Sequence, residues 1–224
     1  MPLIQHPSFG SQPVKYDVTY LPDDPDGQVA ITINRMRQYA REDAGSPEIQ
    51  RELRNALRSY PQLSPLEAIF RWGKTHTRFL NDVDIVTPIA GGLKGVGNHP
   101  IIETLVRPRD LVIMAQPTED CDGHAMYGAS MLMAAGVPPS DIWFVTVAAD
   151  PADPTQFSHV YLAAMLNGVR VPIDISHGDY PGWEVPAARR YRVAEWSLNS
   201  PMESLLLFGV AAYGAYKILE RRAA

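Results

Sequence analysis

The dipeptide Asn167-Gly168 constrains the fold of this chain more than any other feature of the sequence. It separates residues 157–166 from residues 169–175, and both runs are rich in branched and apolar side chains. Both positions of such a dipeptide tolerate positive φ, which the turn of a two-residue β-hairpin requires. A two-residue loop also fixes the register, so that Leu166 faces Val169 and every further pair follows outward from there.

This register gives the hairpin one apolar face and one polar face. We expect the apolar face to lie against the core, because a slip by one residue would bury His159 and expose the valines. On the polar face His159 and Asp174 are diagonal neighbours, with Cβ atoms roughly 7–8 Å apart or less, so an imidazole–carboxylate hydrogen bond is within reach. Pro172 has no N–H to donate to a ladder, which predicts either an edge strand or a local distortion there. The apolar pairs are Leu166 with Val169, Ala164 with Val171, Leu162 with Ile173, and Val160 with Ile175.

The single cysteine of the chain, Cys121, lies where a helix is expected to begin. Residues 120–135 carry apolar side chains at helical spacing, and glycine and proline follow to end the helix. Thr118 or Asp120 is suited to cap the helix start. A thiolate at this positive end of the helix dipole is stabilised, although the neighbouring carboxylates oppose that effect. An adjacent imidazolium would have to supply the rest of the activation.

Cysteine, histidine and aspartate together form a constellation suited to thiol acyl transfer. Taken alone, a histidine on a strand is usually structural and a cysteine is usually a small hydrophobe. Because Asp174 shares a face with His159, we favour a functional interpretation: Cys121 as nucleophile, His159 as base and Asp174 as the group that orients the imidazole. The backbone N–H of Cys121 is expected to stabilise an oxyanion, with Gln116 or Trp72 as a further donor.

The order of these motifs resembles the transglutaminase-like superfamily, whose members have a papain-like thiol fold. The resemblance implies the same three catalytic residues but does not fix the reaction, since the superfamily includes transglutaminases, peptidases, amidases and members that have lost activity. Gly123 is a departure, because many relatives have an acid there. The resemblance spans residues 64–176 and lies in the helix 65–77 with Phe-Leu-Asn-Asp at 79–82, Asp-Cys-Asp at 120–122 with Ala125, the helix end at 134–138, the strand 142–147, Ser-His-Val-Tyr at 158–161 and Pro-Ile-Asp at 172–174.

The sequence as a whole predicts an α+β fold, with helices before the nucleophile and the nucleophile's own helix packed on an antiparallel sheet. Three earlier helices are expected: one capped by Asp26 and stopped at Gly45, one starting at Ser46-Pro47, and one starting with the capping box Ser64–Glu67. We therefore expect an extended arm at residues 1–25, a transglutaminase-like domain at residues 26–199 and a separate C-terminal segment at residues 200–224.

The residue pattern of that C-terminal segment predicts an apolar helix over residues 201–222, which begins in a second capping box. Lys217 is the only charged residue between 205 and 219. A helix that is apolar on every side lies in a core, against a partner or in lipid. Residues 204–219 are slightly fewer than the roughly 17–25 needed to span a bilayer. Packing within the domain and anchoring to a membrane or a larger assembly both stay open.

The charge and cysteine content exclude some classes of function. The formal net charge is −5 without a block of like charge, which argues against nucleic acid as a partner. One cysteine excludes an internal disulfide, and no secretory signal is recognisable at the N-terminus. We interpret the basic patch of Arg189, Arg190 and Arg192 as a solvated loop.

No cofactor motif is recognisable, so none is expected. The glycine-rich run 90–100 matches neither a phosphate loop nor a dinucleotide turn. A metal site made of Cys121, His124 and His99 lacks any established ligand spacing, so we expect no metal.

Two functions from different classes follow. The first is an enzyme that attacks an amide bond of a protein or peptide substrate through Cys121; we favour hydrolysis over crosslinking to an amine, because excluding water needs a deep tunnel that this small chain gives no sign of building. The second is a non-catalytic structural or anchoring protein, such as a component of a phage or membrane particle. The intact triad favours the first, whereas the apolar tail and the extended arm favour the second.

Overall fold

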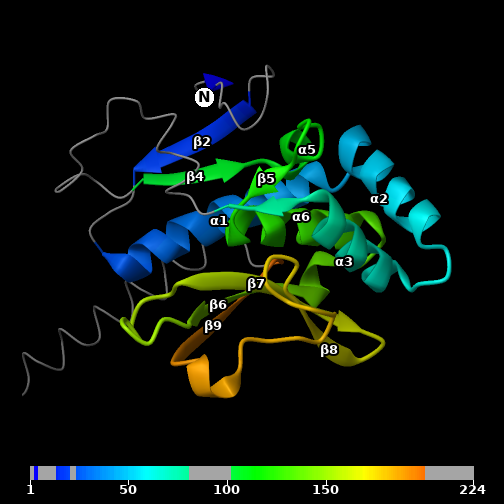
Figure 1. Ribbon diagram of the computed structural model, residues 1–224. Coiled ribbons are helices and arrows are strands. Elements are labelled where there is room, and N and C mark those ends of the chain that lie inside the picture. The colour runs from blue at the N-terminus through cyan, green and yellow to red at the C-terminus, as the bar shows by residue number, and fades with distance from the viewer. Residues whose placement is uncertain (1–2, 5–13, 21–23, 81–101, 200–224) are drawn as a thin grey trace, which may run out of the picture.

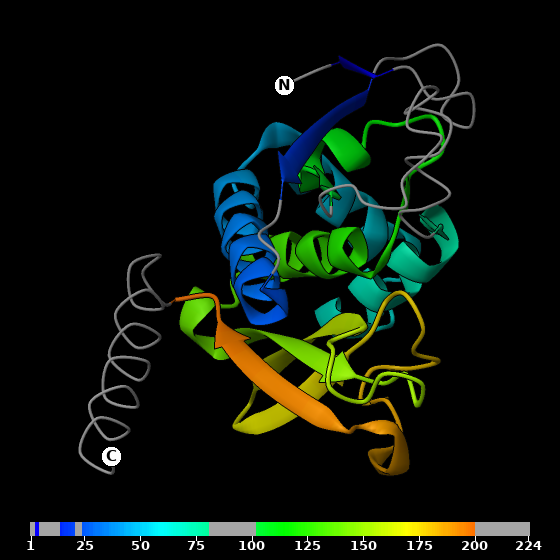
Figure 2. The ribbon, with the colours of Figure 1, turned by 90° about the vertical axis from the view of Figure 1, so that its left-hand side faces the viewer.

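Helices and an antiparallel sheet form two layers (Figures 1 and 2). The structure, a computed structural model, describes residues 3–4, 14–20, 24–80 and 102–199. The helices are α1 Pro25–Asp43, α2 Pro47–Ser59, α3 Pro65–His76, α5 Pro108–Leu111 and α6 Cys121–Ala134. The main sheet has the strand order β8-β7-β6-β9 and consists of β6 Ile142–Ala148, β7 His159–Leu166, β8 Val169–Ile173 and β9 Arg192–Ser197. This mixed α and β architecture is compatible with a papain-like arrangement.

Two smaller sheets lie outside the main one. The strands β1 Leu3–Ile4, β2 Val14–Tyr20 and β4 Ile102–Val106 pair antiparallel in that order. The predicted N-terminal arm therefore contains two strands, and β2 joins it to a strand far along the chain. The short strands β3 Arg78–Phe79 and β5 Thr118–Glu119 pair in parallel, so the segment after α3 lies beside the segment that leads into α6.

The first three helices begin at capped residues, as the sequence indicates. The serine caps of α2 and α3 are confirmed, including the reciprocal capping box of Ser64 and Glu67. The predicted cap of α1 is wrong: Asp24, not Asp26, accepts the N–H of Gly27. The cap lies two residues earlier than predicted because Pro25 follows Asp24, and proline suits the first helical position. Asp26 instead forms an ion pair with Arg192, at 2.7 Å.

The hairpin has the predicted register. Asn167 and Gly168 both have positive φ, at 53° and 78°, and Leu166 pairs with Val169. The ladder continues through Leu162 and Ile173 in the expected pairing. The strand β8 is an edge strand, as the proline at 172 predicts.

The two faces of β7 lie in different surroundings. One face, with Val160, Leu162 and Ala164, belongs to the main core beneath the helices. The opposite face is also buried: Tyr161 and Ala163 pack with valines of β6 and with Val185 from the segment after β8. The face that the sequence predicts as polar is therefore covered by that segment, and only its end at His159 meets a pocket.

Helix α6 lies at the centre, in contact with α1 on one side and β7 on the other (Figure 1). Gly128 permits the close approach to the sheet, because a Cβ at this position would stand 2.7 Å from Leu162 Cδ1 and 2.9 Å from Ile175 Cδ1. This packing carries the first residue of α6, Cys121, to the end of β7 where His159 lies.

Two predictions lie outside the described residues: the apolar helix at 201–222 and the glycine-rich run at 90–100. Within the described residues, no helix combines the length and hydropathy that crossing a membrane requires.

Candidate active site

Cys121 is the first residue of α6, and its neighbours fix the start of that helix. The carboxylate of Asp120 accepts the N–H of Asp122 at 2.9 Å, so Asp120 is the cap. The other predicted cap, Thr118, donates its hydroxyl to the carbonyl of Gln116 instead. Gly123 is needed here because a Cβ would overlap the side chain of the buried Glu119. Glycine at position 123 thus has a local steric reason.

His159 and Asp174 form the predicted hydrogen-bonded pair. His159 Nε2 lies 2.7 Å from Asp174 Oδ2, and Asp174 is only 1% exposed. The other carboxylate oxygen accepts the hydroxyl of Ser176 at 2.7 Å and the N–H of His177 at 2.9 Å. Gly178 permits this tight turn, because a Cβ there would stand 2.6 Å from the carbonyl oxygen of Asp174.

These partners keep Asp174 ionised. Burial raises the pKa of this carboxyl, but the hydrogen bond and charge of His159, with the donors from His177 and Ser176, outweigh burial and lower the pKa to about 2. A carboxylate only accepts hydrogen bonds, so Nε2 of His159 carries the proton that it donates to Asp174. In the neutral ring Nδ1 is then unprotonated, which is the state a general base requires.

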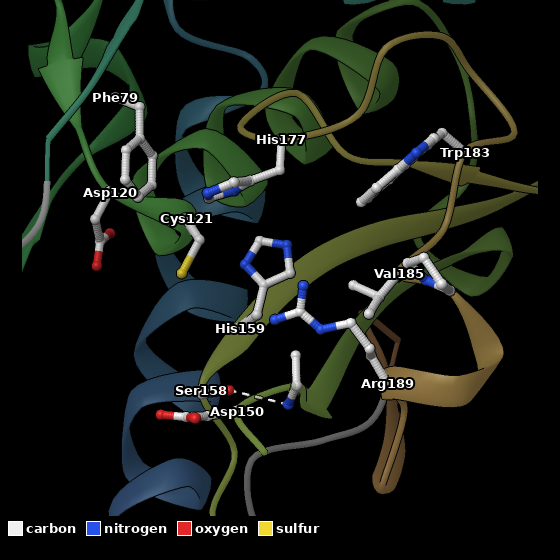
Figure 3. Close-up of a pocket in the computed structure, with 12 residues that line it drawn as sticks. Phe79, Asp120, Cys121, Asp150, Ser158, His159, His177, Trp183, Val185 and Arg189 are labelled. Carbon is white, nitrogen blue, oxygen red and sulfur yellow. Dashed lines mark hydrogen bonds between the residues drawn. The ribbon is translucent and has the colours of Figure 1, made fainter. Parts of the chain in front are cut away.

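Cys121 and His159 line two pockets that meet between them. The larger cavity has a volume of about 640 Å³ and the smaller about 230 Å³, and both include Asp120, Cys121, Ser158 and His159. Figure 3 shows the sulfur of Cys121 and the imidazole of His159 facing the same space. The smaller cavity extends toward α1. A substrate crossing the thiol would therefore have room on either side of it.

A second histidine, His177, also faces the larger cavity, and sequence reasoning did not find it. Its ring makes edge-on contacts with Phe79 and His159, at centroid distances of 4.7 and 4.9 Å. Partial burial lowers the pKa of His177, the charges of His159 and Lys74 add to that effect, and Asp174 opposes it. The feature of the sequence that could have indicated this residue is its position, three residues after the proposed catalytic Asp174.

The segment between β8 and β9 forms the far wall of the larger cavity. Trp183, Val185, Pro186 and Arg189 line it there, while Phe79 and Ala149 add apolar surface. The three arginines that the sequence analysis interprets as a solvated loop have different surroundings. Arg190 pairs with Glu184 at 2.8 Å, and Arg192 pairs with an aspartate of α1, whereas Arg189 faces the cavity.

Trp72 and Gln116, the predicted side-chain donors for an oxyanion, lie elsewhere. Both line a different pocket, which contains neither Cys121 nor His159. The indole N–H of Trp72 donates to Glu52 at 2.6 Å, and its ring stacks on His76. Neither residue lines the pockets that contain the thiol, and Trp72 is instead held against Glu52 of α2.

The residues around the thiol include possible metal ligands. In the described part of the chain, His159, Asp174 and His177 form one group with ligand atoms within 4.8 Å of one another, and residues 120–122 form a second. A metal on the first group would compete with the hydrogen bonds of Asp174. His124 belongs to neither group, because both its ring nitrogens face other partners, the carbonyl of Asp120 and the hydroxyl of Thr77.

No protein-family model matches this chain, and no curated protein matches it. Among solved structures, the chain is similar to that of a putative cysteine protease from Cytophaga hutchinsonii, with 14% sequence identity and a TM-score of 0.37. The match covers 66% of this chain and 47% of that protein, so the chain spans about half of the other's length. At this level of similarity the comparison supports no assignment of activity, and any functional proposal depends on the geometry of the site.

Proposed function

We propose that this chain is a thiol-dependent acyl-transfer enzyme that hydrolyses an amide or peptide bond. The observation that carries the proposal is the bond from His159 Nε2 to the buried carboxylate of Asp174, beside a cavity that both His159 and Cys121 line. This bond selects the imidazole tautomer whose other nitrogen accepts a proton. The pairing gives His159 the role of base and Cys121 the role of nucleophile.

The first half of the reaction forms a thioester. His159 Nδ1 takes the proton of the Cys121 thiol to form a thiolate–imidazolium pair, and the thiolate sulfur then attacks the carbonyl carbon of the substrate. The carbonyl oxygen becomes an oxyanion at the N-terminus of α6, where the helix dipole favours negative charge. The carbon–nitrogen bond then breaks, and the imidazolium of His159 gives its proton to the leaving amine.

The second half returns the enzyme to its starting state. His159 takes a proton from a water molecule as the water oxygen attacks the thioester carbon, and the carbon–sulfur bond breaks. A carboxylic acid leaves, and the sulfur recovers its proton from the imidazolium. Water rather than an amine acceptor is favoured because exposed residues, among them Asp150, His177 and Arg189, line the larger cavity and leave it open to solvent.

The alternative, a non-catalytic anchoring protein, depends on residues 201–222. These lie outside the described residues, so no described contact favours it. The two hypotheses differ in one measurable property, which is the reactivity of the only thiol in the chain.

The test is the rate of Cys121 alkylation by iodoacetamide as a function of pH, followed by intact mass. Because the chain has one cysteine, a single mass increment reports this site. We expect rapid labelling that persists near pH 6 in the parent and collapses in His159→Ala. The matched control is His76→Ala, which removes an exposed histidine of another pocket and is expected to label like the parent.

A different result would overturn the proposal. Slow labelling with a midpoint near the free-thiol value of about 8.5, unchanged by His159→Ala, indicates a site without a thiolate–imidazolium pair. A positive result leads to screening of peptide amides, in which turnover that is lost in Cys121→Ala is the expected outcome.

A further inference from the structure

Arg189 points into the larger cavity, on the side opposite to the helix that carries Cys121. It is the last residue of a 3-10 turn, Ala187–Arg189, and it is exposed. Figure 3 shows its guanidinium group extending toward the ring of His159. Its side chain has no ion pair or hydrogen bond with any of the described residues, although its two basic neighbours, Arg190 and Arg192, each pair with a carboxylate.

The turn that carries Arg189 is held by contacts on its other side. Glu184 accepts hydrogen bonds from Tyr161, Arg170 and Arg190, at 3.1, 3.1 and 2.8 Å. Val185 is buried against the outer face of the sheet. The turn closes with a hydrogen bond from the N–H of Arg189 to the carbonyl of Pro186, at 2.7 Å. The backbone position of Arg189 is therefore set by packing, and its side chain is left facing the cavity.

Two carboxylates line the same cavity, and neither forms an ion pair with Arg189. Asp150 also lines the cavity, but one of its carboxylate oxygens accepts the N–H of Ala152 in its own turn. Its carboxylate is directed away from Arg189 in Figure 3. Asp120, on the opposite wall, caps α6. Apart from these two acids, histidines and mostly apolar side chains line the cavity, so a substrate anion that reaches Arg189 meets its positive charge.

We infer that Arg189 binds a carboxylate of the substrate close to the scissile amide. A guanidinium group presents a planar fork of donors that matches a carboxylate with two parallel hydrogen bonds. Trp183 and Val185 on the same wall would pack against the apolar part of that substrate. This inference rests on the proposed function, and it narrows the substrate class to amides that carry a carboxylate next to the cleaved bond.

Such a carboxylate has two chemical sources. It is either the terminal carboxylate of a peptide cleaved near its end or the side chain of an acidic residue beside the amide. Two pairs of alkylating reagents separate them. N-Iodoacetylglycine and N-iodoacetylglycinamide differ only in a terminal carboxylate, whereas the iodoacetyl derivatives of glutamate α-amide and glutamine α-amide differ only in a side-chain carboxylate.

The experiment compares alkylation rates of Cys121 within each pair, in the parent and in Arg189→Gln. We expect the parent to react faster with the acidic member of at least one pair, and this preference to fall by about tenfold in Arg189→Gln, since a hydrogen-bonded charge is lost. That pair identifies the source of the carboxylate. Arg189→Lys keeps the charge without the fork, so we expect it to retain part of the preference.

The matched control is Arg51→Gln, which removes the same charge from an exposed position on α2, away from both cavities that include Cys121. It is expected to keep the parental preference. Equal preferences in the parent and Arg189→Gln for both pairs would overturn the inference while leaving the proposed function intact. Slow labelling of the parent by all four reagents, unchanged in His159→Ala, would instead remove the reaction itself and overturn both.

Discussion

Two histidines of the region around Cys121, His159 and His124, lie in opposite environments. His159 is on β7, its side chain is 10% exposed, and its partner is the ionised Asp174. His124 is three residues after Cys121 on α6, is 3% exposed, and has neutral partners, the carbonyl of Asp120 at 2.6 Å and the hydroxyl of Thr77 at 2.8 Å. Proximity to the thiol along the chain would favour His124 as its partner, but the environment favours His159.

The difference shows that the burial and hydrogen-bond partners of a histidine determine whether its ring has a structural role or is suited to proton transfer. Burial lowers the pKa of His124 to about 4, and the hydrogen bond to the Asp120 carbonyl only partly opposes this. His124 is therefore neutral at pH 7 and serves to hold the start of α6. The ring of His159 instead donates Nε2–H to a carboxylate, which selects the tautomer whose Nδ1 can accept a proton.

The largest expected effect that tests this comparison is on turnover. Because the imidazole is the proposed base, His159→Gln is expected to lower the rate with a cleavable peptide amide by about 10³-fold, within the range known for general-base removal. The melting temperature is also expected to fall, because the buried carboxylate of Asp174 loses its bond from the imidazole, so the rate is measured well below the melting temperature of the variant. His76→Gln is the control. A loss smaller than tenfold in His159→Gln would mean that the ring is not the base.

The next effect concerns the carboxylate beside His159. Asp174→Asn is expected to lower turnover by about 10²-fold, because the amide no longer selects the imidazole tautomer or stabilises the imidazolium. The depressed pKa of Asp174 also stabilises the folded chain by about 2 kcal/mol. This stability is fully present above 3.8, the pKa in the unfolded chain, and is lost as the pH falls through about 2, the pKa in the folded chain. Denaturation by urea at pH 7 and pH 2.5 measures it.

Asp174→Asn itself provides the check on both expected effects of this carboxylate, on turnover and on stability in acid. If Asp174→Asn loses as much stability as the parent between those two pH values, the carboxylate does not account for the acid sensitivity. If turnover is unchanged, the hydrogen bond to His159 has no part in the chemistry.

His124 is expected to affect the free energy of unfolding at higher pH than Asp174 does. The unfolded chain binds a proton at His124 near pH 6.5, whereas the folded chain does so only near pH 4, so stability falls as pH drops between these values. From pH 7.5 to pH 4.5 the loss is about 2–3 kcal/mol. Urea denaturation at the two pH values measures it, and His124→Asn is expected to reduce this dependence. Equal slopes in parent and variant would contradict the assignment.

The smallest expected effects come from the hydroxyl partners of the two histidine sites. Ser176→Ala removes one donor to Asp174, and Thr77→Val removes the hydroxyl beside His124. Each is expected to lower the free energy of unfolding by about 1 kcal/mol, the usual contribution of one hydrogen bond. Only Ser176→Ala should also lower turnover, by about threefold, because only it touches the pair that serves the thiol. An equal loss of turnover in Thr77→Val would remove the distinction between the two sites.

Short-range patterns predicted the parts of the site that depend on short-range geometry. The turn at Asn167-Gly168 and the alternation on either side of it fix the hairpin register, and the register alone brings His159 to Asp174. The cap at Asp120 is likewise encoded within three residues of Cys121. The prediction of Asp26 as the cap failed because Asp24 suits a cap equally well, and the start of the helix depends on the proline between them.

Short-range patterns could not predict which residues of the segment after β8 line the cavity. Trp183 and Arg189 line the cavity although no periodicity marks the stretch that carries them. Trp72 was misassigned because its indole N–H is taken by Glu52, which is on the preceding helix, and pairing across helices leaves no signal in spacing.

The sequence by itself determined the hairpin, the capped start of α6 and hence the orientation of the three proposed catalytic residues within their own elements. Tertiary structure decided that His159 lines the same cavities as Cys121, and that Arg189 is the one of the three arginines that lines the larger cavity. The physical reason is that turns and caps depend on a few adjacent dihedral angles and hydrogen bonds. The packing of α6 on β7, and of the β8–β9 segment over the outer face of the sheet, instead depends on burial between residues far apart in the chain.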